Sequence, residues 1–214
     1  LLGAVGRVLP MSPVPLEIVA DVDCSTGREF APVRRIRGQV AVASTPGRVL
    51  SVQLIPEHPP ACAEAVAAVR AADWVVLGPG SWFSSVLPHL LVPDLCDALV
   101  ETSARRIVAL NLAPQPGETE GFSPAAHLDV LAKHAPDLRI DVVLADQQAQ
   151  VADRPLARAA ESMGGRLVLA PIAADDGSSR HDHDRLAQEY HRLMIGPATS
   201  PAASDRTASQ DPGR

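Results

Sequence analysis

The chain has 214 residues and a formal net charge of −6 without a dense basic patch, which argues against nucleic acid or an anionic membrane surface as its main partner. Apolar residues make up 46% of the sequence but aromatic residues only 3%, so the core must be built from Val, Leu, Ile and Ala. The widely spaced cysteines Cys24, Cys62 and Cys96 argue against a disulfide framework and favour a cytoplasmic location, and no apolar run approaches the ~20 residues of a membrane helix.

The first ten residues are typical of the end of a helix. Leu1, Val5, Val8 and Leu9 keep helical spacing up to Pro10, and the chain does not open on Met. We therefore expect the sequence to be a fragment of a longer protein.

Residues 10–55 are predicted to form β-structure, because short apolar and alternating runs are separated by turn residues. The strands are expected over residues 16–22, 28–34, 39–43 and 49–55. We interpret them as an antiparallel hairpin excursion that returns to the main sheet near Val49. The arginines of this excursion, Arg34, Arg35 and Arg37, are predicted to lie on a solvated strand face rather than to clamp a phosphate.

From Ile55 the pattern changes to alternating helices and strands. Apolar runs predict buried strands over 74–77, 106–110, 140–144 and 166–170, with helices over 61–71, 94–102, 125–134 and 185–194 and a short helix followed by a loop over 86–93. This order predicts an α/β fold with a Rossmann-like, doubly wound, mainly parallel sheet over residues 1–195. The tail, residues 196–214, has little to bury and is predicted to be disordered.

A glycine-rich turn follows the strand at Trp74. Gly78 and Gly80 allow positive φ and close approach, and Ser81 and Ser85 offer hydroxyl groups where a helix could begin. Backbone N–H groups at such a turn suit a phosphate. A strand-to-helix turn without any ligand is the alternative.

Ligands of doubly wound sheets gather beyond the carboxyl ends of the strands. The segments that follow the four predicted strands are residues 78–85, 111–121, 145–148 and 171–180. We expect these four loops to converge on one cleft.

Two of these segments carry a family resemblance. Leu77-Gly78-Pro79-Gly80-Ser81 with Leu90-Leu91-Val92-Pro93, and the stretch from Asn111 to Phe122, resemble the YvcK family of gluconeogenesis factors in the wider CofD-like group. Val8 to Ser12 and Arg180-His181-Asp182 also resemble that family, so the match extends over roughly residues 8 to 192. Full members begin with a glycine-rich turn and an Asp-Asp-Gly-Gly-Ser-type segment, and neither occurs in this sequence.

The resemblance implies a cytoplasmic bacterial protein that binds a nucleotide-sugar such as UDP-N-acetylglucosamine. It also implies a role in cell shape and cell-wall synthesis during gluconeogenic growth, without an established reaction and without a cofactor. The CofD relatives imply an alternative, a transferase that moves a phospholactate unit onto the deazaflavin Fo and uses Mg²⁺. A homo-oligomer is left open.

Ten residues are the candidate ligand contacts. The turn supplies phosphate contacts, the loop after the next strand supplies groups that could read a sugar or uracil, and an arginine near the last helix could hold a diphosphate. The residues are Gly78, Gly80, Ser81, Ser85, Asn111, Gln115, Gly117, Glu118, Thr119 and Arg180. The alternatives are a self-satisfied surface loop for residues 111–119 and an ordinary surface arginine for Arg180.

Catalytic and metal-binding residues are not predicted. His181 and His183 are two positions apart and would not share a helical face, which argues against a metal site in the His-Asp-His-Asp run. The serines are many, and no general base is singled out among the histidines and carboxylates.

Overall fold

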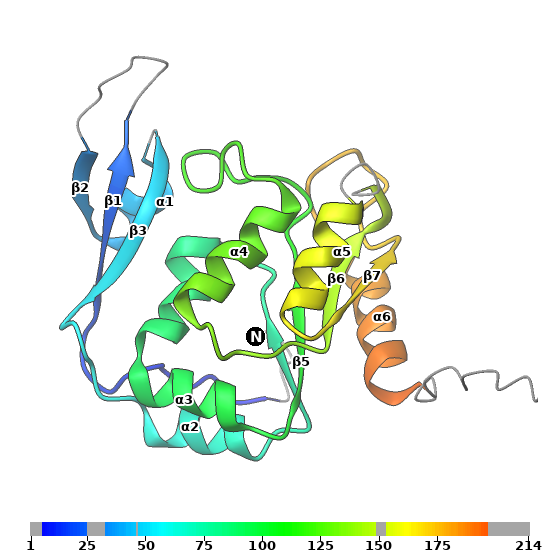
Figure 1. Cartoon of the computed structure of the whole chain (residues 1–214), viewed down its shortest axis with the longest axis horizontal. Helices are drawn as coiled ribbons and strands as arrows, with labels where there is room; N and C mark the ends of the chain where they lie inside the picture. Colours follow the sequence, from blue (N-terminus) through cyan, green and yellow to red (C-terminus); the bar gives the residue numbers. More distant parts are fainter. Residues whose placement is uncertain (1–5, 25–32, 46, 149–152, 197–214) are drawn as a thin grey trace, which may run out of the picture.

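The computed structural model describes residues 6–24, 33–45, 47–148 and 153–196. The predicted tail beyond residue 196 and residues 1–5 of the predicted N-terminal helix lie outside this range. Residues 6–10 are not helical, so the helix predicted up to Pro10 is wrong for them. The fold is α/β, with one antiparallel sheet and one parallel sheet separated by helices (Figure 1).

The antiparallel sheet has the strand order β2-β1-β3, formed by β1 (Glu17–Asp23), β2 (Val33–Arg37) and β3 (Arg48–Ile55). Its alternating residues Ile18, Ala20 and Val22 face the core and are almost fully buried. The prediction that the chain returns to the main sheet near Val49 is wrong, because β3 pairs along its length with β1.

Residues 39–43 form the short helix α1 (Gln39–Ala43) and not the predicted strand. The central strand β1 is already paired on both edges, so no inner place in the sheet remains for another strand. Gly38, at φ +94°, turns the chain out of β2, and Val42 alone of the helix is buried.

The parallel sheet has the order β4-β5-β6-β7, formed by β4 (Trp74–Leu77), β5 (Arg105–Ala109), β6 (Val142–Asp146) and β7 (Arg166–Ala170). The four predicted strands are confirmed: β4 and β7 have the predicted boundaries, whereas β5 and β6 are shifted by one and two residues. Every neighbouring pair is parallel, as the alternation of helices and strands predicts.

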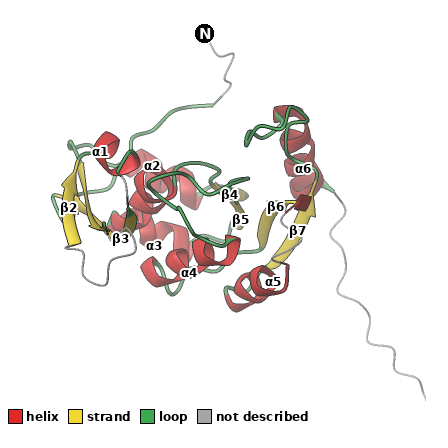
Figure 2. Ribbon diagram, turned by 90° about the horizontal axis from the view of Figure 1, so that it is seen from above, coloured by secondary structure: helices red, strands yellow, loops and turns green. Residues whose placement is uncertain are grey.

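Helices cover both faces of this sheet (Figure 2). One face packs with the antiparallel sheet and the intervening helices in a single core, and the other packs against the last helix. The helices of the first face are α2 (Ala63–Arg70), η1 (Trp82–Val86), η2 (Leu87–Leu91), α3 (Pro93–Glu101), α4 (Pro124–His134) and α5 (Asp153–Ser162), and the last helix is α6 (His183–Ile195). Ser123 caps α4 by accepting a hydrogen bond from the Ala126 N–H.

Among the described residues no single helix is long and apolar enough to cross a membrane. The pair Trp82–Leu91 and Pro93–Glu101 reaches that length and composition only across a bend of 84°. Within this pair Trp82, Leu87 and Leu95 belong to the protein core.

Candidate functional site

A cleft of about 360 Å³ lies beyond the carboxyl ends of β5, β6 and β7. We name it the β5–β7 cleft. Three of the four segments predicted to converge contribute to it. Its polar lining consists of Asn111, Asp146, Gln148, Ser178 and Ser179, and its other walls are Leu110, Leu112, Pro124, Ala145, Ala173, Ala174 and Gly177.

Asp146 fixes the floor of this cleft. The side chain is almost completely buried at the end of β6, and its Oδ2 accepts hydrogen bonds of 2.9 Å from the backbone N–H groups of both Ile172 and Ala173. Its Oδ1 accepts another, of 2.8 Å, from the Gln148 N–H. One carboxylate therefore holds the segments after β6 and β7 in a fixed relation, and its two oxygens are satisfied by the protein.

The fourth predicted segment, the glycine turn after β4, lines a neighbouring hollow of about 320 Å³. We name it the β4 hollow. Gly78, Gly80, Ser85 and His89 form its polar end, and the rest is apolar, with Val75, Val76 and Leu77 among its lining residues. Ser85 and His89 are exposed there.

Two hydrogen bonds between the Gly80 backbone and the Asn111 side chain separate the two spaces. The Gly80 N–H donates to Asn111 Oδ1 at 3.0 Å, and Asn111 Nδ2 donates to the Gly80 carbonyl at 2.8 Å. Because Gly80 lines the β4 hollow and Asn111 lines the β5–β7 cleft, the two spaces lie on either side of this pair.

Gly78 meets the conditions that the sequence predicts for the turn. Its φ is +78°, and a Cβ placed there would lie 2.6 Å from the Ala109 carbonyl oxygen. Gly80 has φ +157° and open space where a Cβ would be. The positive φ expected at both glycines is therefore confirmed, whereas close approach requires a glycine only at Gly78.

The N–H groups predicted to receive a phosphate have a partner inside the protein. The carboxylate of Glu118 accepts hydrogen bonds from the Trp82 N–H at 3.1 Å and the Ser84 N–H at 2.9 Å. The Ser81 hydroxyl donates to the same carboxylate, 2.7 and 2.8 Å from its two oxygens, and also contacts the Ser84 hydroxyl. Glu118 is only 1% exposed, so this carboxylate does not face either space.

Other predicted loop residues are also directed inward. Thr119 is fully buried, and its Oγ1 accepts a 2.8 Å hydrogen bond from the Gln115 N–H. Gly117 packs so closely on the antiparallel half that an added Cβ would lie 2.3 Å from the Thr45 carbonyl oxygen. For Glu118 and Thr119 the geometry is that of a self-satisfied loop, whereas Asn111 lies at the cleft.

Arg180 lies in the segment that forms the rim of the β5–β7 cleft. Its side chain is 77% exposed, and its guanidinium donates to Asp176 at 2.6 Å and lies 3.3 Å from the Ser178 hydroxyl. Hydrogen bonds from Ser178, together with that from Arg180, hold the pKa of the Asp176 carboxyl well below its usual range. Arg180 is therefore an accessible cation with an exposed internal partner, a pair that an anionic ligand could compete with.

Burial favours the neutral form of two histidines near the site. Burial lowers the pKa of His181, whose Nε2 is buried without a hydrogen-bond partner in the described part of the chain. Burial likewise lowers the pKa of His127, which stacks edge-on with Trp82 and Phe122 beneath the Glu118 loop. Among the described residues no group of three or more His, Cys, Asp or Glu side chains could hold a metal ion.

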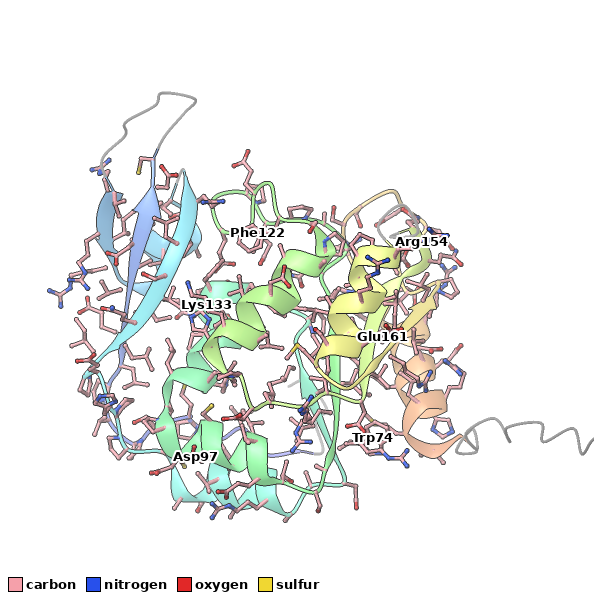
Figure 3. All side chains as sticks on the ribbon, in the orientation of Figure 1. Trp74, Asp97, Phe122, Lys133, Arg154 and Glu161 are labelled. Atoms are coloured by element: carbon pink, nitrogen blue, oxygen red, sulfur yellow. The ribbon has the colours of Figure 1, made fainter. Side chains whose placement is uncertain are left out.

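Side chains fill the space between the two halves (Figure 3). Phe122 extends from the loop after β5 and packs edge-on against Phe83, while Trp74 lies near the opposite end of the parallel sheet. Sequence reasoning missed Asp146, Gln148, Ser178 and Ser179 as cleft residues, although it placed their segments correctly. The signal was the position of Asp146 at the end of a strand, where a carboxylate can reach the next loop.

Comparison with known proteins identifies the family. A family model described as 2-phospho-L-lactate transferase CofD matches residues 1–195. The chain belongs to this CofD family. It is 46% identical to a "Putative gluconeogenesis factor" of Mycobacterium tuberculosis over 100% of this chain and 64% of the relative, and 28% identical to the "Gluconeogenesis factor" of Halalkalibacterium halodurans over 80% and 49%.

A solved structure shows the same fold. A UPF0052 family protein from Bacillus halodurans superposes with a TM-score of 0.70 at 24% identity, covering 86% of this chain and 61% of that protein. The resemblance read from the loops at Gly78 and Asn111 is thus confirmed. The chain spans about 64% of the length of its Mycobacterium tuberculosis relative.

Proposed function

We propose that this protein binds a nucleotide-sugar of the UDP-N-acetylglucosamine type and acts as a sensor without catalysing a reaction. The observation that carries the proposal is the pair of adjoining spaces on either side of Asn111 and Gly80. A nucleotide-sugar has two bulky ends joined by a diphosphate, and a pair of neighbouring spaces suits such a ligand.

The lining supports a ligand that is recognised by directional hydrogen bonds. Gln148, Ser178 and Ser179 offer amide and hydroxyl groups in the β5–β7 cleft, as a sugar or uracil requires. Ser85 offers a hydroxyl in the β4 hollow, and Arg180 offers a guanidinium at the rim for the diphosphate. As the family resemblance implies, the protein would support cell-wall synthesis and cell shape during gluconeogenic growth in the cytoplasm.

Isothermal titration with UDP-N-acetylglucosamine, on the protein at the full length of its relatives, tests the proposal. We expect saturable heat for the wild type and weaker binding for Arg180→Ala. Absence of both heat and a thermal shift at high ligand concentration would reject nucleotide-sugar binding.

Gly80→Val projects a branched side chain into open space beside the turn, so it should weaken binding. Unchanged affinity at unchanged stability would remove Gly80 from the site.

The description of the matching family model supports a second candidate, a phospholactate transferase acting on the deazaflavin Fo with Mg²⁺. It predicts a new product when the protein is incubated with a nucleotide-linked phospholactate donor and Fo. Product formation that depends on Mg²⁺ would replace the sensor proposal, whereas binding of UDP-N-acetylglucosamine without turnover favours it.

A further inference from the structure

We propose that Glu118 is the positioning residue of the ligand site: its buried carboxylate holds the glycine turn after β4 against the loop after β5 and thereby sets the Asn111–Gly80 pair between the two spaces. The consequence for ligand binding rests on the proposed function. The consequence for the turn itself does not.

The carboxylate of Glu118 accepts hydrogen bonds from several donors that all lie in the short segment after the glycine turn. Two backbone N–H groups, of Trp82 and Ser84, and the Ser81 hydroxyl donate to its two oxygens at distances between 2.7 and 3.1 Å. A carboxylate buried to this degree needs hydrogen bonds on both oxygens to offset its loss of hydration. The turn supplies them, so the two segments are bound to each other by charge-assisted hydrogen bonds.

A hydrogen-bonded path runs from Glu118 to the ligand spaces. The N–H groups of Glu118 and Thr119 donate to the Gln115 carbonyl, and Thr119 Oγ1 accepts from the Gln115 N–H. The Gln115 side chain in turn lies 3.3 Å from Asn111 Nδ2, which reaches Gly80. Glu118 and Asn111 thus fasten the loop to the turn at two points, and a shift at one must be taken up at the other.

Burial decides that Glu118 positions the site rather than contacting the ligand. Its exposed fraction of 1% leaves no surface for a ligand, and Phe122 packs against Phe83 beside it as an apolar third tie between the same segments. A phosphate seated on the Trp82 and Ser84 N–H groups would have to displace a buried carboxylate with all its partners in place. The diphosphate is therefore assigned to Arg180 and the exposed Ser85 hydroxyl.

Glu118→Gln is the informative substitution, because it keeps the size of the side chain and replaces one acceptor oxygen by an N–H donor that faces other donors. Glu120→Gln, two positions along the same loop and exposed, is the matched control. Ser81→Ala is the second variant and removes one donor without touching the carboxylate. Each is measured at a temperature where its thermal melt shows a fully folded protein.

Two readouts are combined. Hydrogen–deuterium exchange with residue resolution follows the amides of Gly80, Trp82 and Ser84 in the free protein, and isothermal titration follows UDP-N-acetylglucosamine. In Glu118→Gln we expect faster exchange at all three amides and affinity reduced about tenfold or more, with a smaller loss in Ser81→Ala and no change in Glu120→Gln.

Faster exchange at Trp82 and Ser84 alone, with Gly80 protected as in the wild type, would overturn the proposal. The effect of Glu118 would then be confined to the amides that it contacts directly. Wild-type affinity in Glu118→Gln would overturn its role in binding. If the wild-type protein binds no UDP-N-acetylglucosamine, the proposed function fails, and the Gly80 exchange rate alone decides whether Glu118 positions the turn.

Discussion

Gly78 shows at the scale of one residue why the turn after β4 requires glycine. Its φ of +78° is unfavourable for any residue with a side chain, and the Ala109 carbonyl oxygen occupies the space that a Cβ would need. We expect Gly78→Ala to lower the free energy of unfolding by about 1–3 kcal/mol, from strain together with a forced shift of β5. Urea unfolding measures this. Gly6→Ala, where no atom lies within 4 Å, should change little, and equal losses in the two variants would contradict the argument.

The lowered pKa of His127 predicts a stability that depends on pH. Burial favours its neutral form in the folded state, whereas in the unfolded chain it takes up a proton below about pH 6.5. The unfolded state then binds more protons, so the free energy of unfolding is fully present above that pH and falls as the pH drops towards the lowered pKa. Burial acts in the same direction on His181.

Urea unfolding at about pH 7.5 and about pH 5.5 tests this linkage. His127→Phe preserves an aromatic ring beside Trp82 and cannot titrate, so its loss of stability between the two pH values should be smaller than that of the wild type. The exposed His191 supplies the control, since His191→Gln should lose as much as the wild type does. An identical pH response in His127→Phe and the wild type would remove His127 as a cause.

At the scale of elements, a buried arginine joins β5 to the end of α3. Arg106 Nε donates to the Leu99 carbonyl at 2.7 Å, and Nη2 donates to the carbonyls of Val100 and Thr102 at 2.9 and 2.6 Å. These acceptors belong to the last turn of α3 and its C-cap, where helix carbonyls lack partners and the dipole is negative. The guanidinium thus closes the helix and fixes its distance from the sheet.

Arg106→Lys should destabilise the protein by about 1–3 kcal/mol, because a lysine cannot direct donors to three carbonyls from one plane. Chemical denaturation gives the free energy, and circular dichroism reports whether helix content is retained. Arg166→Lys, at an exposed position in the parallel strand β7, should have little effect. A similar loss in both variants would show that the arrangement of donors at Arg106 does not matter.

The elements that sequence predicts well are those whose pattern agrees with their surroundings. The strands at Trp74 and Val142 are short apolar runs, and β6 is buried along its whole length, so their composition is enough to predict them. Residues 39–43 alternate like a strand but form α1, because pairing of β1 on both edges is a tertiary fact that no local pattern contains. Helix α5 is not among the predicted helices, because its sequence is mostly polar and only a narrow face, which includes the buried Leu156 and Ala160, is apolar.

The same distinction separates the predicted site from the observed one. Gly78 and Asn111 lie at the carboxyl ends of strands, and this position follows from chain order in a parallel sheet. That the donors of the glycine turn are satisfied by Glu118 could not be predicted. It depends on how the loop after β5 folds back through its own turn between Gln115 and Thr119.

At the scale of the whole molecule, the two sheets differ in how their edges meet solvent. Strand β2, an edge of the antiparallel sheet, carries Arg34, Arg35 and Arg37, and charged side chains oppose pairing with another chain. Strand β4, an edge of the parallel sheet, has the sequence Trp-Val-Val-Leu and no charge. Within the described part of the chain β4 pairs only with β5, so the backbone groups along its other side have no strand to bind.

We therefore expect the 214-residue chain, purified by itself, to self-associate through β4. The apolar β4 hollow lies along this edge, and Val76 is only half-buried although it packs with the core beneath α6. Sedimentation velocity should show a mean mass that rises with protein concentration. Val76→Lys places a charge on the edge and should return the chain to the mass of a monomer, while Val33→Lys on β2 should leave association unchanged. Thermal melts identify any variant that has lost its fold, and a wild-type chain that stays monomeric over the whole concentration range would show that β4 is protected in solution.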